Sequence, residues 1–404
     1  MNQTNRTIAM IGLEIGETTV EVGDDVVGRA LVDQFDRVHR TSVAEADVTI
    51  EFRRGFVRPP DGCVEIHGGL WVDGDELFVD GRGGSVAFGP FGEILDRIGR
   101  AGHQARIRGN PLRGPVEVTV FYDERAVGSD HRLLRQLVRS YDKNYASRPE
   151  VVAVKLIEDL VEALLHQRLL SRGSGLFHAS GVVRDGEATL FAGWGGVGKS
   201  DVSGELVREY GYDLLGDDLV IVSEDGTASP YRGRMRASPE SIADGEATYE
   251  EVMNGRGLLD RGQWRIRERL GGSTAVRRNV LPSSLTGHSA DADELSQSPV
   301  ATVVNLIVED RETIHVERTT PEDVAERGAS TVMAELQPFT DKMRAVHAAT
   351  PTHWPDLREV AERSDQTYRG ALTAADTYLV SVPPEVSGPQ LADELSNRVL
   401  SDAD

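Results

Sequence analysis

The chain has 404 residues and a formal net charge of −22, with 39% hydrophobic and 27% charged residues. The length predicts two or three structural units, and the charge argues against a nucleic-acid partner held by a broad basic surface. With a single cysteine (Cys63), no apolar run of about 18 residues and no signal peptide, we expect a cytoplasmic protein without disulfides or membrane partners.

The basic residues are nearly all arginine. Of the 44 Lys and Arg residues only four are lysines, at positions 143, 155, 199 and 342. Few lysines, many carboxylates and a strong negative charge are typical of a halophilic protein, because high salt screens the self-repulsion. The alternative is an ordinary acidic protein from a GC-rich genome.

Residues 1–145 predict a β-rich α+β unit. Alternating apolar runs separated by Gly and Asp turns indicate a hairpin meander over residues 61–89. The histidines of this unit are scattered and support no metal site. Further strands are expected at residues 8–15, 48–57 and 116–122.

The middle segment, residues 146–320, begins with the clearest helix of the chain. Leucines repeat at helical spacing over residues 151–171, and Gly173 supplies a stop. Residues 175–183 and 187–192 then predict two strands joined by a tight turn. We therefore expect an antiparallel hairpin directly before the glycine-rich loop that follows.

The run Gly193-Trp-Gly-Gly-Val-Gly-Lys-Ser200 fits the phosphate-binding pattern G-x-x-x-x-G-K-[ST]. Such a loop turns backbone N–H groups toward phosphate oxygens at the start of a helix, here expected over residues 201–210. The pattern predicts that Lys199 reaches the β- and γ-phosphates and that Ser200 ligates Mg²⁺, so ATP and Mg²⁺ are the expected cofactors. A glycine-rich structural turn is the alternative, and Trp194 either flanks the nucleotide or is a packed aromatic. The expected nucleotide-binding residues are Gly193, Trp194, Gly195, Gly196, Val197, Gly198, Lys199, Ser200 and Asp201.

Two adjacent carboxylates, Asp217 and Asp218, precede an apolar run at residues 219–222. One could hold Mg²⁺ together with Ser200 while the other accepts the proton of an attacking hydroxyl group. An acidic surface turn is the alternative in a chain with 66 Asp and Glu residues. The position of the pair, one short connection after the loop helix, favours the functional interpretation.

The downstream segment is less informative. Residues 230–278 are polar and rich in arginine, and one arginine could clamp a transferring phosphoryl group, although surface ion pairs are the alternative. Arg277 and Arg278 precede apolar residues and could point back into a cleft.

Residues 321–404 predict a C-terminal α/β extension packed on the core. The expected elements are a mobile loop at 284–299, strands at 302–308 and 377–382, and helices from Thr320 and over 388–400.

The segment from His178 to Val222 resembles the catalytic core of the HPr kinase/phosphorylase family, which shares its fold with phosphoenolpyruvate carboxykinases. A histidine stands fifteen residues ahead of Gly193, and Gly-Val-Gly-Lys-Ser is followed by Asp201. Asp217 stands eighteen residues beyond Lys199 and opens an apolar strand. The family's downstream Glu-x-Arg-Gly-type segment has no match here.

The resemblance implies an α/β fold, with a P-loop kinase domain of the HPr kinase/carboxykinase type behind the N-terminal β-rich unit. It implies that Asp217 is the general base, that Lys199 binds the phosphates and that His178 lies beside the catalytic carboxylate. It also implies that Ser200 and Asp218 hold Mg²⁺.

We therefore expect an ATP- and Mg²⁺-dependent phosphotransferase that moves the γ-phosphate to a hydroxyl group of a protein serine or a small molecule. A nucleotide-hydrolysing or nucleotide-sensing switch is the first alternative, and a module that binds nucleotide without transfer is the second. A GTPase is disfavoured because the chain has no Asn-Lys-x-Asp motif. Self-association into a homo-oligomer is left open.

Overall fold

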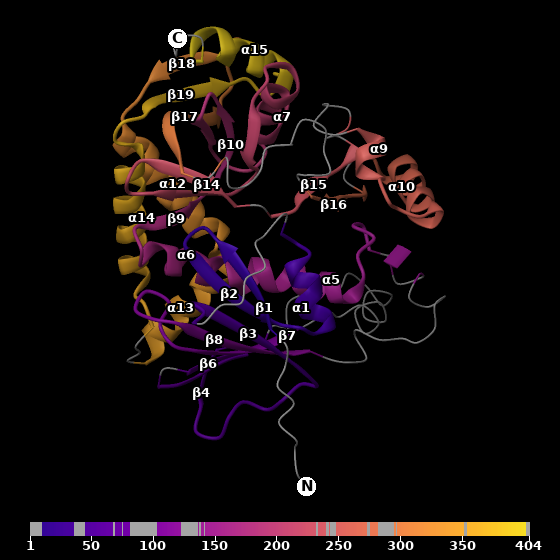
Figure 1. Ribbon diagram of the computed structural model, residues 1–404, viewed down its shortest axis with the longest axis vertical. Coiled ribbons are helices and arrows are strands. Elements are labelled where there is room, and N and C mark those ends of the chain that lie inside the picture. Colours follow the sequence, from indigo (N-terminus) through magenta and orange to yellow (C-terminus); the bar gives the residue numbers. More distant parts are fainter. Residues whose placement is uncertain are drawn as a thin grey trace.

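The computed structural model describes residues 10–35, 45–67, 69–74, 76–80, 103–122, 136, 139–140, 142–231, 233–239, 242, 248–272, 275–281, 295, 297–350 and 354–400. In this part of the chain the fold is mixed α/β with two large sheets, one in the lower and one in the upper half of Figure 1. Its helices include none that is both long and apolar enough to cross a membrane.

The lower sheet has eight strands within the described residues, in the order β1-β2-β3-β8-β7-β6-β5-β4. The antiparallel ladder from β4 to β8 confirms the predicted meander, although the run at 85–88 lies outside the described residues. Helix α1 (Val26–Val32) follows β2 and begins at Asp25, whose side chain accepts the Val27 N–H. The strands are β1 (Met10–Ile15), β2 (Thr18–Gly23), β3 (Val48–Arg54), β4 (Val64–His67), β5 (Leu70–Asp73), β6 (Glu76–Asp80), β7 (His103–Arg108) and β8 (Val116–Tyr122).

A long helical segment joins the two sheets. It comprises α5 (Arg148–Leu156), a π-helical turn η1 (Ile157–Val161) and α6 (Glu162–Leu170), and it confirms the predicted helix. The leucine spacing does not reveal the π-helical turn, which inserts a residue and rotates the side chains that follow. Arg168 of α6 forms an ion pair with the buried Asp47 ahead of β3 (2.7 Å), so the helix is fastened to the lower sheet.

The upper sheet has nine strands in the described part of the chain, with the parallel strands β11, β17 and β19 at its centre. The predicted hairpin is confirmed: β10 and β11 pair antiparallel, and their turn places Asp185 (φ 55°) and Gly186 (φ 84°) in the left-handed region. The strands are β9 (Ser174–Phe177), β10 (Ala179–Arg184), β11 (Glu187–Ala192), β12 (Asp213–Gly216), β13 (Val220–Ser223), β14 (Thr227–Pro230), β17 (Ser298–Val308), β18 (His315–Arg318) and β19 (Asp376–Val382).

The single strand predicted over residues 175–183 is wrong. The chain breaks at His178, because β9 pairs with β13 whereas β10 pairs with β11 and β12. His178 belongs to neither ladder, and its Nε2 lies 3.1 Å from Lys199 Nζ.

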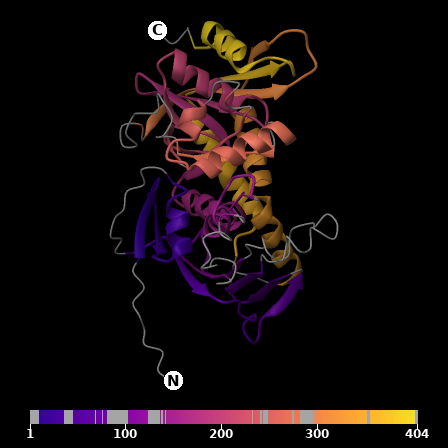
Figure 2. The same cartoon turned by 90° about the vertical axis from the view of Figure 1, so that its right-hand side faces the viewer.

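Helices cover both faces of the upper sheet. Helix α7 (Lys199–Glu209) packs with α15 (Gly388–Arg398) on one face, in an apolar cluster that includes Phe191 and Val304. Helices α12 (Pro321–Glu335) and α14 (Leu357–Leu372) pack on the other face with α6, and Figure 2 shows α13 (Gln337–Ala349) continuing toward the lower sheet. The predicted helix start is confirmed, since the Thr320 side chain accepts the Asp323 N–H (3.2 Å).

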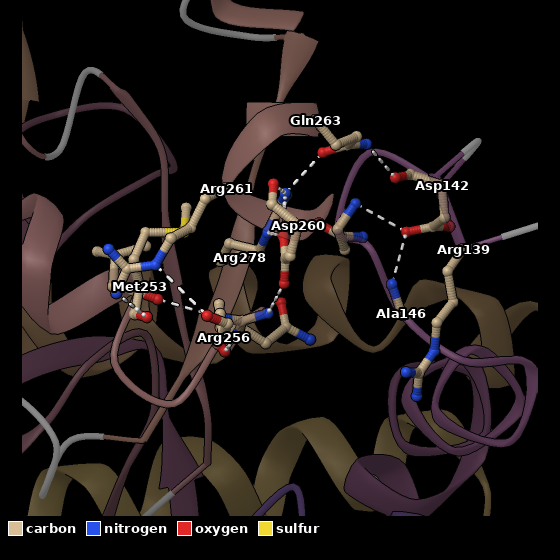
Figure 3. A network of polar contacts seen from close by, with 12 residues as sticks. Arg139, Asp142, Ala146, Met253, Arg256, Asp260, Arg261, Gln263 and Arg278 are labelled. Carbon is tan, nitrogen blue, oxygen red and sulfur yellow. Dashed lines mark hydrogen bonds and ion pairs between the residues drawn. The ribbon is translucent and has the colours of Figure 1, made fainter. Parts of the chain in front are cut away.

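A small lobe projects at the right of Figure 1. Its centre is the fully buried Arg278, whose Nε lies 2.7 Å from Asp260 Oδ1 and whose Nη2 lies 2.6 Å from Gln263 Oε1 (Figure 3). Arg256 reaches the other Asp260 oxygen (3.1 Å). Arg278 is therefore engaged in a buried ion pair and does not point into the cleft considered for it. The lobe comprises β15 (Met235–Ala237), α9 (Tyr249–Val252), α10 (Leu258–Gly271) and β16 (Arg278–Val280).

The neutral state of His166 contributes to the stability of the core. Its Nδ1 accepts the Leu176 N–H (3.2 Å), and its Nε2 donates to Ser364 Oγ (2.9 Å), whose own hydroxyl donates to Val360 O. Burial lowers the pKa of His166 to about 3. The unfolded chain therefore takes up a proton at higher pH than the folded one, so stability is complete above about pH 6.5 and falls as the pH decreases.

We expect His166→Gln to flatten the pH dependence of the unfolding free energy below pH 6.5, by an amount that approaches about 1.4 kcal/mol per pH unit near pH 5. Denaturant unfolding at several pH values measures this slope, and His315→Gln on the exposed strand β18 controls for replacing a surface histidine. Equal slopes in the wild type and His166→Gln would contradict the prediction.

Candidate active site

The glycine-rich loop runs from the end of β11 to the start of α7, at the carboxyl ends of the central parallel strands. Two of its positions require glycine. At Gly193 (φ 143°) a Cβ would lie 2.5 Å from the Leu306 carbonyl oxygen, and Gly198 (φ 92°) starts the helix in the left-handed region. The loop therefore approaches β17 more closely than any side chain would allow.

Lys199 is buried beneath this loop. Its Nζ donates to Gly193 O (2.9 Å) and Trp194 O (3.1 Å) and lies 3.1 Å from His178 Nε2. Burial lowers the pKa of the ammonium, while Asp218 and Asp217 favour its charged form. Burial and the Lys199 charge lower the pKa of His178 to about 4, so the imidazole is neutral and its Nε2 accepts an ammonium proton.

The Asp pair lies next to the loop helix. Ser200 Oγ donates a 2.7 Å hydrogen bond to Asp217 Oδ1. Burial and the adjacent Asp218 carboxylate raise the pKa of Asp217 to about 7. Asp218 is exposed and adopts φ 63°, a backbone conformation that is uncommon for a residue with a side chain. The two carboxylates thus differ: Asp217 is tied to the loop helix, and Asp218 opens to solvent.

A cavity of about 520 Å³ opens beside the loop. It brings together His178, Gly195, Asp217 and Asp218, and the hydrogen bonds above connect Lys199 and Ser200 to them. Among the remaining lining residues, Arg234 and Arg236 belong to the arginine-rich segment considered for a phosphoryl clamp, and most of the others come from distant segments that no sequence motif marks. The remaining lining residues are Gln34, Phe35, Val154, Ile157, Glu158, Asp159, Glu162, Leu219, Tyr231, Gly233, Arg234, Arg236, Asn279, Val332, Glu335, Leu336 and Pro338.

The loop fits a nucleotide phosphate group. No atom lies within 4 Å of a Cβ built at Gly195 or Gly196, and residues 194–196 are exposed. Trp194, at 56% exposure, is not packed into the core. An open backbone, an ammonium group and a helix N-terminus are features that suit an anion.

The donors available for Mg²⁺ are Ser200 Oγ and the Asp pair. In the part of the chain that the structure describes, no group of three or more His, Cys, Asp or Glu side chains is arranged to hold a metal ion. This donor set suits Mg²⁺ bound with a nucleotide, because Mg²⁺ commonly takes one or two protein oxygens and completes its shell with phosphate and water.

Part of the chain is similar in structure to a known protein. The structure of the Hpr(Ser) kinase/phosphatase from Coxiella burnetii matches 36% of this chain and 76% of its own chain, with 19% sequence identity and a TM-score of 0.17. No protein-family model matches the chain. No curated protein matches it either. The similarity is partial and distant, so a function has to be argued from the site itself.

We expect Lys199→Ala to weaken binding of ATP by about tenfold or more, because a charged hydrogen-bond donor to the phosphates is lost. Titration with ATP in high-salt buffer measures the affinity, and Lys143→Ala, at an exposed lysine, is the matched control. An unchanged affinity in the folded Lys199→Ala variant would show that this loop does not bind nucleotide phosphates.

Proposed function

We propose that the chain is an ATP- and Mg²⁺-dependent phosphotransferase, a P-loop kinase similar in kind to HPr kinase, which transfers a phosphoryl group to a hydroxyl group. The observation that carries the proposal is the hydrogen bond from Ser200 Oγ to Asp217 Oδ1, which joins the phosphate-binding loop to the Asp pair. Asp218 extends the pair into a cavity large enough for an acceptor. A nucleotide-hydrolysing or nucleotide-sensing switch remains the alternative, but it needs no such cavity.

Lys199 and the loop would hold the nucleotide. Bound ATP would supply the phosphoryl group and Mg²⁺ would neutralise its charge, with Ser200 and one carboxylate of the Asp pair as ligands. Lys199 would exchange its bonds to Gly193 O and Trp194 O for phosphate oxygens. His178, neutral and in contact with Lys199 Nζ, positions the ammonium without adding a second positive charge.

The roles of general base and Mg²⁺ ligand can be assigned to the two carboxylates in two ways. The resemblance implies that Asp217 is the base and Asp218 the Mg²⁺ ligand. The hydrogen bond from Ser200 favours the reverse, because a P-loop serine and its partner carboxylate commonly hold the same ion. Asp218, exposed in the cavity, would then accept the hydroxyl proton. We adopt this second assignment.

The assignment predicts different effects for the two neutral variants. Asp218→Asn should lower kcat by ~10²–10⁴-fold with ATP affinity retained, because the base is lost. Asp217→Asn should raise the Mg²⁺ concentration needed for half-maximal activity, because a metal ligand is lost. Asp185→Asn, a 92% exposed carboxylate in the hairpin turn, is the control.

Initial rates of ADP formation at varied Mg²⁺ concentration measure both effects. If Asp217→Asn lowers kcat at saturating Mg²⁺ while Asp218→Asn changes only the Mg²⁺ requirement, the assignment implied by the resemblance holds. If neither variant changes turnover, the phosphotransferase proposal itself is overturned.

A further inference from the structure

The cavity continues past the Asp pair to a wall built by the N-terminal part of the chain. Phe35, just after α1, packs edge-on against Tyr231 with ring centroids 5.7 Å apart. The Phe35 backbone pairs with Gly233, and Arg234 Nε donates to Asp33 O (2.7 Å). The acceptor side of the cavity is thus enclosed by two segments remote in sequence.

The walls carry an excess of negative charge. Of the described residues that line the cavity, six are Asp or Glu and two are Arg. Arg236 forms an ion pair with Glu158, and Arg234 is held by the Asp33 carbonyl oxygen. An anionic acceptor would meet carboxylates of like charge in a partly desolvated space, which is unfavourable. The charge therefore favours a neutral or cationic acceptor.

Glu162 lies at the centre of this wall. Tyr231 donates its hydroxyl to Glu162 Oε1 (3.2 Å), yet within the described residues no lysine or arginine forms an ion pair with this carboxyl. Burial raises the pKa of Glu162 to about 7; the Glu158 and Asp218 carboxylates add to this rise, whereas the Tyr231 hydroxyl and the Arg236 charge oppose it. A cation bound here would relieve the cost of burying the carboxylate and would also contact the aromatic side chains.

We infer, on the basis of the proposed phosphotransfer, that the acceptor is a small amine that carries a hydroxyl group. Its ammonium group binds Glu162 beside Phe35 and Tyr231, and its hydroxyl group reaches Asp218. The cavity volume of about 520 Å³ falls within the range of small-molecule sites.

The reaction balances with ATP as the phosphoryl donor. The acceptor oxygen forms a bond to the γ-phosphorus, and the bond from this phosphorus to the β–γ bridging oxygen breaks. The hydroxyl proton passes to the Asp218 carboxylate, and ADP leaves with the electron pair of the broken bond.

The test compares four acceptors of different charge with the full chain, ATP and Mg²⁺ in high-salt buffer. They are ethanolamine, glycerol, glycerate and a neutral seryl peptide, and ³¹P NMR identifies any phosphorylated product. We expect ethanolamine to have the highest kcat/KM. A higher value for glycerate, glycerol or the peptide would overturn the inference while leaving phosphotransfer intact.

Glu162→Gln tests the ammonium site directly. The amide oxygen can still accept the Tyr231 hydroxyl, but the charge is lost, so KM for ethanolamine should rise by about tenfold or more. ATP affinity measured by titration should stay within twofold, and Glu187→Gln, at an exposed position of β11 outside the cavity, is the control. An unchanged KM for the amine overturns the inference.

If ATP binds but no acceptor of any class is phosphorylated, the proposed function fails, and the acceptor class fails with it.

Discussion

The burial of one ammonium group is the constraint on which the site depends. Lys199 is 4% exposed, and its charge is tolerated because carbonyl oxygens of Gly193 and Trp194 and the His178 ring accept its protons. The loop carbonyl groups above the ammonium and a histidine that stays neutral beside it meet this need. The histidine stands at the break between β9 and β10.

The two carboxylates of Asp217 and Asp218 also affect the charge of the buried ammonium. Two acidic groups beside a buried ammonium stabilise its charge, but they also repel each other, and the more enclosed one then holds its proton more tightly. Asp217 carries this penalty and is partly compensated by the Ser200 hydroxyl, whereas the left-handed backbone at Asp218 turns that residue to solvent. The two adjacent residues thus differ in burial and in hydrogen bonding.

Most of the correct predictions from the sequence rest on patterns that span only a few residues. The hairpin, the loop-to-helix junction and the start of α12 at Thr320 depend on turn, capping and periodicity rules within a few residues. The break at His178 depends on which strands pair across the sheet, and no proline or turn motif within residues 175–183 marks it. The lining residues Phe35 and Glu162 were also missed, because each lies in an ordinary amphipathic helix or its end and only the tertiary fold brings them together.

The overall negative charge of the chain repels a nucleotide, whereas the loop and Lys199 would attract its phosphates. A chain with a net charge of −22 repels a polyphosphate at long range, and the cavity walls add further carboxylates. High salt reduces the range of this repulsion to about 3 Å at 1 M, whereas the contacts of Lys199 beneath the loop are direct and partly desolvated and are screened much less. The acidic surface and the single buried lysine are therefore compatible where screening is strong. Under the same screening, close contacts such as the one proposed with Glu162 would select the acceptor.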